Sequence, residues 1–432
     1  MKTAENMNKK ISYMTASLHN LGCKVNQYET DALGQMLKEV GVTIVEFGQK
    51  ADITIINTCS VTNIADQKSR QMINRARRIN PECIVVAAGC YVQTKENLKP
   101  GDLGADILLG NNEKSKLIDC LEKFIENREK QIYKVEDTNT LTEYEQLEFS
   151  EESSHTRAFV KVEDGCNAFC SYCIIPYARG RVRSRTVADA VFEAKKLAEK
   201  GYKEIVLSGI HLPSFGMDTG ENLLDLIKAI HKIDDIKRIR LGSLEPRVIT
   251  REFAEEISKL EKLAPHFHLS LQSGCDATLK RMNRKYSAAE YKEKCDILRE
   301  VYDNPALTTD VICGFPGETP EEFEESYNFV KDIGFYEMHV FKYSRRHGTV
   351  ADRLPDQISE NVKTERSKRL IELSEKMSEA YIASMKGKRA EIILEDEAEE
   401  DGEKGRVGFS AHYIKTFVPG DNKQGEIVDV IL

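Results

Sequence analysis

The most constraining feature of this 432-residue chain is a short loop in which three cysteines are spaced C-x3-C-x2-C. The loop, residues 165–173, directly follows a strand-like apolar run at residues 158–162. An iron–sulfur cubane is held by cysteine thiolates, and three thiolates leave one iron without a protein ligand. A zinc knuckle would need a fourth Cys or His at matched spacing, and none lies nearby. The loop therefore predicts a [4Fe-4S] cluster on Cys166, Cys170 and Cys173 whose open iron can be chelated by a small molecule.

The composition is that of a globular protein, with 41% hydrophobic and 31% charged residues. The length is sufficient for two or three domains. No apolar run approaches the roughly 18–20 residues of a membrane helix, and residues 1–10 lack the apolar core of a signal peptide. Eleven cysteines in such a chain favour thiolate ligation in a reducing compartment over a disulfide framework. We therefore expect a cytoplasmic protein that does not enter a membrane.

The net charge of −9 argues mildly against a nucleic-acid partner, because affinity for phosphate comes largely from Lys and Arg. Local clusters matter more than the total. Three basic groups lie near candidate active-site loops: Lys68, Arg70, Arg75, Arg77 and Arg78; Arg179, Arg181, Arg183 and Arg185; and Arg281, Arg284 and Lys285. Each group alone is best interpreted as a solvated face. The occurrence of all three near these loops nevertheless leaves RNA binding as an alternative.

One design occurs three times within residues 1–150. A β-rich apolar run, at residues 11–18, 51–56 and 84–88, is followed each time by a cysteine and then by helical periodicity. This pattern predicts a parallel α/β sheet, in which the carboxyl ends of the strands gather at one edge where ligands bind. We therefore expect Cys23, Cys59 and Cys90 to converge on a second cluster, again with an open iron.

The other cysteines of this region fit no ligand set. Cys83 begins its strand and so belongs to the opposite edge, and Cys120 falls within a helix-like run. We interpret both as packing residues, and a buried inert thiol is also the alternative for any single member of the triad. Residues 135–154 are acidic and lack apolar periodicity, which predicts a linker to the next domain.

Strand-like and helix-like segments alternate through residues 151–385. The strand-like runs are residues 158–162, 204–208, 238–244, 266–271, 307–313 and 337–343. Parallel repeats of this number predict a partial (β/α)6 barrel. By analogy with complete barrels, chemistry belongs at the carboxyl ends of these strands, where the cysteine loop already lies.

Polar turns follow several of these strands. They contain Ser208 and Gly209, Ser243 and Glu245, Gln272, and the run 314–318. Ordinary turn chemistry is the alternative to a ligand site, and it is strongest for residues 314–318, because Thr319, Pro320 and Glu322 predict a helix start with a capping box. The remaining cysteines and the histidines of the domain receive no catalytic role: Cys275, Cys295, Cys313, His211, His266, His268, His339 and His347.

Residues 386–432 become β-like after a long helical pattern at residues 359–385. Short strands at residues 389–394, 405–410, 413–418 and 425–431, separated by turn residues, predict a small barrel. Residues 395–403 are strongly acidic and predict an exposed hairpin tip. RNA contact would then come from Lys404, Arg406, Lys415 and Lys423, with Tyr413 and Phe417 for stacking. A purely structural barrel is the alternative.

The cysteine loop resembles that of the radical S-adenosylmethionine (SAM) superfamily, in which an aromatic residue, here Tyr172, precedes the third cysteine. In that superfamily the amino and carboxylate groups of SAM occupy the open iron. The motifs at residues 21–29, 57–62 and 88–91 resemble the amino-terminal domain of the radical-SAM methylthiotransferases, and the similarity covers essentially the whole chain. The resemblance implies two [4Fe-4S] clusters, bound SAM and, at the carboxyl end, an OB-like TRAM module that binds tRNA.

The resemblance also implies how SAM is held. Ser208 and Gly209 would lie near its amino group, Ser243 and Glu245 near the ribose hydroxyls, and Gln272 near the methionyl portion. These assignments are chemically reasonable, since hydroxyl and carboxylate groups hydrogen-bond a ribose and a glycine turn admits close backbone approach.

Within the family, the Cys-Lys-Val-Asn-Gln form of residues 23–27 is similar to the branch that acts on N6-threonylcarbamoyladenosine beside the anticodon of tRNA. The C2–H bond of adenine is unactivated, so a radical generated with a cofactor is required. The first cluster would cleave SAM to methionine and a 5′-deoxyadenosyl radical, and the second would deliver a sulfur methylated by another SAM. Partners would be tRNA, a reductant and a sulfur donor.

Three other functions stay open. The same chemistry could act on isopentenyladenosine of tRNA or on an aspartate of a ribosomal protein. A non-catalytic iron–sulfur protein that binds RNA and senses redox state is the alternative of another class.

Overall fold

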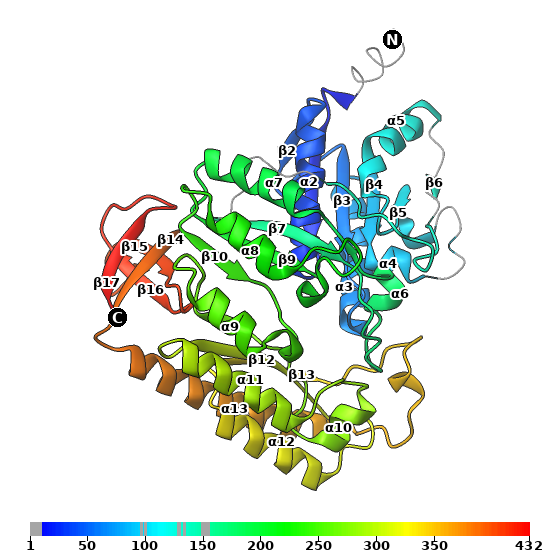
Figure 1. Ribbon diagram of the computed structural model, residues 1–432. Coiled ribbons are helices and arrows are strands. Elements are labelled where there is room, and N and C mark those ends of the chain that lie inside the picture. The colour runs from blue at the N-terminus through cyan, green and yellow to red at the C-terminus, as the bar shows by residue number, and fades with distance from the viewer. Residues whose placement is uncertain (1–10, 96–97, 99–101, 128–130, 133–134, 148–155) are drawn as a thin grey trace.

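The computed structural model describes residues 11–95, 98, 102–127, 131–132, 135–147 and 156–432. Two expectations, the polar start at residues 1–10 and the second part of the linker at residues 148–154, lie outside the described residues. Three β-structures follow one another along the chain: a blue-to-cyan sheet, a green-to-yellow set of strands with outer helices, and a red sheet at the carboxyl end (Figure 1). None of the described helices is long and apolar enough to span a membrane.

The first sheet has six parallel strands in the order β2-β1-β3-β4-β5-β6. Its strands are β1 (Thr15–Asn20), β2 (Thr43–Val45), β3 (Ile53–Thr58), β4 (Ile84–Gly89), β5 (Ile107–Leu109) and β6 (Gln131–Ile132). The central strands β3 and β4 are wholly buried, as expected for a parallel sheet covered on both faces. The predicted parallel sheet is confirmed, and the short strands β2, β5 and β6 are additions to it.

Helices cover both faces of this sheet. They are α2 (Lys24–Glu39), α3 (Asn63–Ile79), α4 (Cys90–Gln93) and α5 (Leu117–Asn127), with short 3-10 turns η1 (Asp102–Gly104) and η2 (Lys114–Lys116). Apolar side chains of α2 and α5 pack with β3 and β4 in one core cluster, and those of α3 pack on the other face. The side chain of Thr62 caps α3 by accepting the backbone N–H of Ala65 at 3.1 Å.

Six parallel strands form the predicted partial barrel. They are β7 (Arg157–Asp164), β9 (Glu204–Gly209), β10 (Arg238–Leu241), β11 (His266–His268), β12 (Ala306–Cys313) and β13 (Glu337–Lys342). The ladders run β10-β9-β7 and β11-β12-β13, and bridges between Ile239 and Leu263 and between Leu244 and Leu269 join the two halves. The short β8 (Arg183–Ser184) pairs antiparallel with the end of β7.

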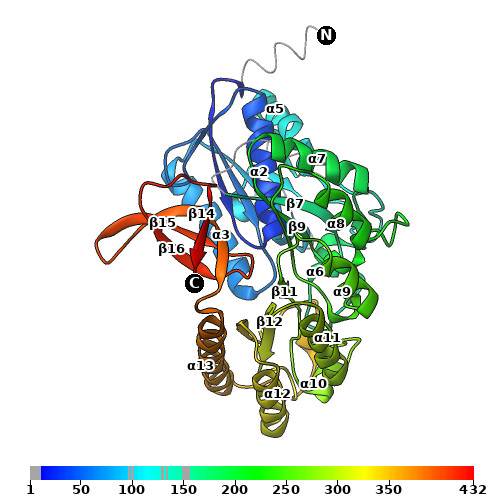
Figure 2. The same ribbon diagram turned by 60° about the vertical axis from the view of Figure 1, so that its left-hand side comes forward.

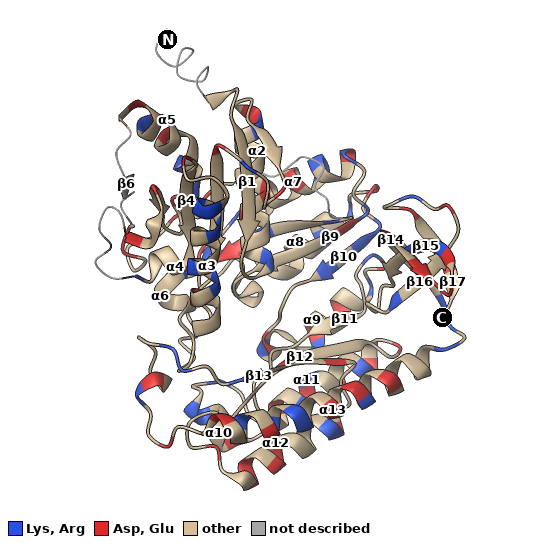
Figure 3. Cartoon of the chain, turned by 180° about the vertical axis from the view of Figure 1, so that it is seen from behind, with Lys and Arg blue, Asp and Glu red and all other residues tan. Residues whose placement is uncertain are grey.

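The helices of this part lie mainly on the outer side of the strands (Figure 1). They are α6 (Ile175–Arg179), α7 (Val187–Glu199), α8 (Leu223–His231), α9 (Arg251–Ser258), α10 (Asp276–Arg281), α11 (Ala288–Val301), α12 (Pro320–Ile333) and α13 (Glu360–Met385), with 3-10 turns η3 (Leu212–Ser214), η4 (Pro246–Val248) and η5 (Ala351–Arg353). Thr319 and Glu322 form the predicted capping box of α12. Figure 3 shows charges of both signs along α12 and α13, as on a solvated surface.

The carboxyl-terminal part is a four-stranded antiparallel sheet in the order β16-β15-β14-β17. Its strands are β14 (Arg389–Glu400), β15 (Glu403–Phe409), β16 (Lys415–Pro419) and β17 (Ile427–Ile431). The acidic run continues β14 into a hairpin that turns at Asp401 and Gly402, both at positive φ. Arg238 and Arg240 of β10 donate hydrogen bonds to carbonyls of this sheet and so dock it against the barrel.

Helix α2 joins the first sheet to the barrel. It packs against β7 and β9 (Figure 2) and buries Glu29 between Lys161, Arg179 and Lys114, with oxygen–nitrogen distances of 2.9, 2.8 and 3.1 Å. Residues 135–147 form no helix or strand, as expected of a linker, yet Leu141 and Leu147 are buried. The described part of the linker is therefore packed onto the two parts it connects.

Candidate active site

Cys23, Cys59 and Cys90 follow the carboxyl ends of the neighbouring strands β1, β3 and β4, and the structure brings them together. A Cβ built on Gly22 would lie 3.2 Å from the Cβ of Cys59. Burial, together with the nearby thiols of Cys90 and Cys23, raises the pKa of Cys59 to about 11. The convergence predicted from the three strand ends therefore holds.

A glycine is required at the turn into Cys90. Gly89 has φ +96°, and a Cβ at this position would lie 2.6 Å from Oδ1 of Asn57 and 2.8 Å from the carbonyl of Thr58. Only glycine avoids both the strain and the contact. The turn makes Cys90 the first residue of α4.

Residues of the barrel contact all three loops of this triad. Near Cys23, Oδ1 of Asn26 accepts a hydrogen bond from Nη2 of Arg179 at 2.7 Å. Next to Cys59, the hydroxyl of Ser60 accepts one from Nη2 of Arg346 at 2.5 Å. Beside Cys90, Asn111 donates to Sγ at 3.4 Å and to the carbonyl of Ala178 at 2.8 Å. The two parts of the chain therefore fix this site jointly.

The donor set fits an iron–sulfur cluster. The site offers three free thiols, of which Cys59 and Cys90 are buried and Cys23 is exposed. A side-chain amide donates to one sulfur, which is a contact that tunes cluster potentials. Cys23 also lines a cavity of about 340 Å³, so one side of the site is open.

The C-x3-C-x2-C loop follows β7 and is held in place by the segment after α10. Ser171 donates its backbone N–H to the carbonyl of Met282 at 3.0 Å, and Asn283 donates to the carbonyl of Phe169 at 2.8 Å. Gly165 has φ +87°, and a Cβ there would overlap the carbonyl of Arg181. The loop therefore has one tightly determined shape.

The thiols of this loop are surrounded by protein. Burial raises the pKa of Cys166 and of Cys173 to about 12, so both are protonated at neutral pH until a metal takes the place of the proton. Nη1 of Arg284 donates to Sγ of Cys170 at 3.3 Å. Tyr172 is packed edge-on against Phe315, with ring centroids 6.4 Å apart, and so has a packing role.

The residues that the sequence suggested for SAM lie at the carboxyl ends of β9, β10 and β11. Ser208 is buried, Ser243 is exposed, and Glu245 pairs with Nε of Arg247 at 2.8 Å. Gln272 is held at φ +72°, a strained conformation for a residue other than glycine. Residues 314–318 instead serve the fold, because Glu318 accepts the N–H of Gly314 and pairs with Arg366.

Sequence reasoning missed Glu163. Its side chain is buried at the end of β7 and touches Gly209, where a built Cβ would lie 2.8 Å from Oε2. Oε2 accepts the N–H of His211 at 2.7 Å, and Oε1 has no hydrogen-bond partner within the described residues. Burial raises its pKa well above the usual value. The signal was the acidic pair at positions 163 and 164 directly before Gly165.

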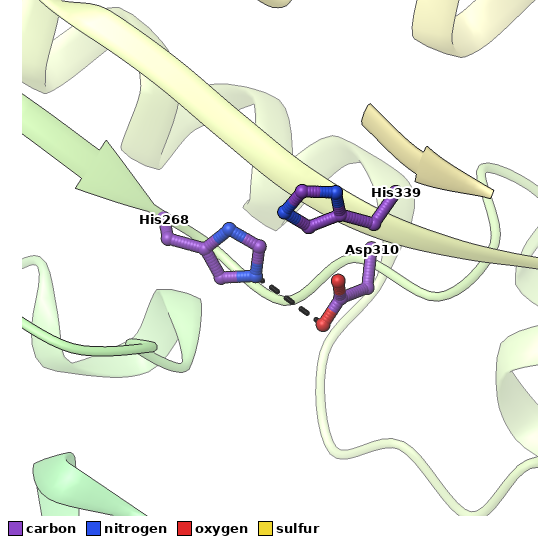
Figure 4. Close-up of side chains that lie close together, drawn as sticks. All are labelled: His268, Asp310 and His339. Carbon is purple, nitrogen blue, oxygen red and sulfur yellow. Dashed lines mark ion pairs between the residues drawn. The ribbon is translucent and has the colours of Figure 1, made fainter. Parts of the chain in front are cut away.

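The inner face of β11, β12 and β13 carries His268, Asp310 and His339 (Figure 4). Nε2 of His268 lies 3.2 Å from Oδ2 of Asp310, and the two imidazole rings stack with centroids 5.7 Å apart. One ligand atom from each residue lies within 4.8 Å of the others, so the three could hold a metal ion. Sequence reasoning gave the two histidines no role, because it had no means of placing them together.

Many arginines of the three basic groups are buried or paired with acidic residues of the protein. Arg179, Arg183 and Arg185 are buried, which corrects their interpretation as a solvated face; Arg185 pairs with Glu193. Arg281 pairs with Glu322, and Arg77 pairs with Asp106 at 2.5 Å. Alternation along residues 179–185 therefore reflects a buried network. The cysteines interpreted as structural, Cys83, Cys120, Cys275, Cys295 and Cys313, are all buried.

Family models match both cysteine-bearing regions. The radical SAM superfamily matches residues 160–330, and an uncharacterized protein family, UPF0004, matches residues 15–110. The chain is 41% identical over 420 residues to the threonylcarbamoyladenosine tRNA methylthiotransferase MtaB of Bacillus subtilis, which covers 96% of this chain and 93% of the relative. The chain belongs to the radical SAM methylthiotransferases. Members of this family use SAM and [4Fe-4S] clusters.

Two other relatives of this methylthiotransferase have names that state different activities. The MtaB of Aquifex aeolicus is 40% identical, over 97% of this chain and 100% of its own length. The tRNA-2-methylthio-N(6)-dimethylallyladenosine synthase of Thermoanaerobacter pseudethanolicus is 35% identical, over 99% of this chain and 91% of its own.

Among solved structures, the radical SAM methyltransferase TsrM of Kitasatospora setae, with cobalamin and a [4Fe-4S] cluster bound, shares the fold. The TM-score is 0.58 at 14% identity, over 76% of this methylthiotransferase and 74% of that chain. OxsB, a cobalamin-dependent SAM radical enzyme, matches with a TM-score of 0.51 at 13% identity, over 86% and 57% of the two chains.

Proposed function

We propose that this protein inserts a methylthio group at C2 of N6-threonylcarbamoyladenosine, next to the anticodon of tRNA. The observation that carries the proposal is the presence of two separate sites of three thiols at strand ends, each within a segment matched by one family model. A radical SAM enzyme with a single chemical task needs one such site. The identity to MtaB proteins supports the choice of nucleoside.

The residues fit the two cofactors that the family uses. Cys166, Cys170 and Cys173 would hold the cluster that provides the electron for SAM cleavage. Cys23, Cys59 and Cys90 would hold the cluster that provides the sulfur. Arg284 places a guanidinium against the sulfur of Cys170. The strand ends that carry Ser208, Gly209, Ser243, Glu245 and Gln272 would orient SAM. Glu163 would accept N–H bonds from the amino group of SAM through Oε1, which has no partner among the described residues, while Oε2 lies beside Gly209.

The chain would work as three domains in the cytoplasm. Residues 1–150 would hold the auxiliary cluster, residues 151–385 the SAM cluster, and residues 386–432 would bind RNA. Lys404, Lys415 and Lys423 are exposed and suit phosphate contact. Arg406 and Tyr413 do not: Arg406 pairs with Glu397, and Tyr413 stacks on Phe409 and His266. An external reductant and a sulfur donor would complete the system.

Nucleoside mass spectrometry of tRNA from a deletion strain tests the substrate. Loss of the methylthio form of threonylcarbamoyladenosine, restored by the intact gene, is expected. Loss of methylthiolated isopentenyladenosine, or of the modified ribosomal-protein aspartate, would assign the alternative substrates instead.

Cysteine variants of the purified protein test the two sites. Cys166→Ala should abolish reductive SAM cleavage, whereas Cys59→Ala should spare cleavage and stop sulfur insertion. Cys83→Ala, which removes a buried cysteine outside both triads, is the matched control. A protein that never releases 5′-deoxyadenosine would be the redox sensor. A Cys59→Ala protein that still transferred methylthio groups would contradict the two-site proposal.

A further inference from the structure

The cavity beside Cys23 lies where all three parts of the chain meet. Its volume is about 340 Å³. Its walls come from the start of α2, from β7 and from β14, and include Asn20, Cys23, Lys24, Arg157, Glu395 and Asp396. The cavity is therefore the space that a substrate would enter to approach the amino-terminal cysteine triad.

Two cations line this cavity, and only one is already paired. Nε of Arg157 lies 2.8 Å from Oε1 of Glu395, and its guanidinium stacks over Phe409 and Tyr413. The ammonium group of Lys24 has neither a hydrogen bond nor an ion pair among the residues that the structure describes, although its side chain is exposed to the cavity. Lys24 is therefore free to bind an anion.

Three of the acids around Lys24, namely Glu204, Asp310 and Glu395, are paired with other residues, whereas Asp396 of the same cavity forms no ion pair within the described residues. Glu204 pairs with Arg238 and Arg240, at 3.2 and 2.8 Å. Asp310 pairs with His268 (Figure 4). Arg157 and Arg240 each have an acidic partner, whereas Lys24 has none within the described residues.

A second feature of the cavity points to a ligand with N–H groups. Nδ2 of Asn20 donates to Oε1 of Gln27 at 2.9 Å, and Nε2 of Gln27 donates to Oδ1 of Asp31 at 2.9 Å. Because an ionised carboxylate only accepts, this chain of bonds fixes the orientation of both amides. Oδ1 of Asn20 is then left buried without a partner within the described residues, and such an acceptor gains from a donor.

We propose that this cavity is the subsite for the acidic N6 substituent of the substrate, with Lys24 as the residue that binds its carboxylate. The inference rests on the proposed function. A threonylcarbamoyl group carries a carboxylate and urea N–H groups, which match the cation and the free acceptor. C2 and C6 of adenine flank N1, and C6 carries N6, so a base that turns C2 toward Cys23 presents its N6 substituent to the adjacent Lys24. An isopentenyl group has no charge and would leave Lys24 unpaired.

The test compares two anticodon stem-loop RNAs that differ by one charge. One carries threonylcarbamoyladenosine and the other carries its methyl ester. Dissociation constants are measured with the cluster-loaded protein in the absence of SAM, so that no turnover occurs. The intact protein should bind the acid about tenfold more tightly than the ester, since the bond is a hydrogen bond to charged groups.

Lys24→Gln should abolish the preference for the acid, and Lys24→Arg, which keeps the charge, should retain most of it. Lys195→Gln, at an exposed position of α7, is the matched control and should behave as the intact protein. Iron content and melting temperature verify that each variant is folded and loaded.

The two proposals fail differently. If the intact protein methylthiolates the acid RNA but binds acid and ester equally, or if Lys24→Gln keeps the preference, the subsite assignment is wrong and the function stands. If the intact protein does not modify threonylcarbamoyladenosine at all, the proposed function is wrong and the subsite assignment falls with it.

Discussion

Arg284 donates a hydrogen bond from Nη1 to the sulfur of Cys170 at 3.3 Å, and its other two nitrogens also donate hydrogen bonds. Nη2 donates to the carbonyl of Ser270 at 3.1 Å, and Nε donates to the hydroxyl of Tyr286 at 2.8 Å. A positive charge is therefore held rigidly beside the middle cysteine of the C-x3-C-x2-C loop.

Replacing this arginine should make the SAM cluster harder to reduce. A cation and a hydrogen bond at a cluster sulfur stabilise the reduced, more negative form. Arg284→Gln should lower the reduction potential by about 60 mV, a tenfold change in a one-electron equilibrium. EPR-monitored redox titration measures this. Arg281→Gln, whose guanidinium pairs with Glu322, is the control. An unchanged potential in a fully loaded Arg284→Gln protein would show that the contact is only structural.

A corresponding contact exists at the other triad, where Asn111 donates to Cys90 and accepts from Nζ of Lys114 at 2.9 Å. Asn111→Ala should remove the donor to the sulfur, while Lys114 keeps its ion pair with Glu29, and so weaken cluster loading at this site only. Iron analysis should show loss of about one cluster per chain, while SAM cleavage continues. Asn139→Ala, an exposed position, should retain both clusters. Equal loss of SAM cleavage would instead indicate general misfolding.

Patterns in the sequence are enough to propose the cluster ligands but not to predict their surroundings. The spacing of Cys166, Cys170 and Cys173 is local, and the strand-end positions of the other triad follow from periodicity within short windows. The contacts that clamp these loops are not local: Arg179 and Glu29 are 150 positions apart, and Arg346 and Ser60 are 286 apart. No pattern within one segment identifies such a pair.

The same limit explains why two interpretations were wrong. The alternating arginines at residues 179–185 suggest a solvated face, but Arg179 donates to Asn26 and Glu29 of α2 and is buried. Tyr413 looked available for stacking on RNA, but its backbone is at φ +67° and its ring is enclosed by Arg240 and His266. Both cases depend on one part of the chain docking on another.

The buried carboxylate of Glu29 should be essential for that docking. Glu29→Gln would leave Lys161, Arg179 and Lys114 short of negative charge in a buried site, which costs about 3–5 kcal/mol. A large fall in melting temperature is expected. Glu261→Gln, whose side chain is 90% exposed, should have almost no effect. If both variants melted at the same temperature, the network would not hold the two parts together.

The carboxylate of Glu29 should also make the stability of the protein depend on pH. Burial raises the pKa of Glu29, but Arg179, Lys114 and Lys161 lower it more, so that it lies well below the ordinary value of 4.5. A carboxylate whose pKa is lower in the folded than in the unfolded protein stabilises the folded state at pH values above the pKa of the unfolded state. This stabilisation is lost as the pH falls below the pKa of the unfolded state toward that of the folded state. The intact protein should therefore lose stability below about pH 4.5 more steeply than Glu29→Gln. Thermal melts across this range provide the measurement.

Arg240 should hold the carboxyl-terminal sheet in place. Its Nη1 and Nη2 donate to the carbonyls of Ala411 and Ser410 at 3.1 and 3.2 Å, and Nε pairs with Glu204 at 2.8 Å. Arg240→Ala would remove these bonds and leave the part-buried carbonyl of Ala411 without this donor, at about 1–3 kcal/mol, whereas the carbonyl of Ser410 keeps the backbone N–H of Tyr413. The sheet should then separate from the barrel more often, since only residues 386–388 connect it to α13.

Limited trypsin digestion measures this separation, because Lys386 and Lys388 lie in the connection. Arg240→Ala should release the carboxyl-terminal fragment faster than the intact protein does. Arg251→Ala, which removes a solvent-exposed ion pair with Glu300, should not. Because Glu395 of this sheet also forms a wall of the cavity beside Cys23, Arg240→Ala should weaken binding of the acid RNA as well. Faster digestion with unchanged RNA affinity would mean that the sheet is not needed to close the cavity.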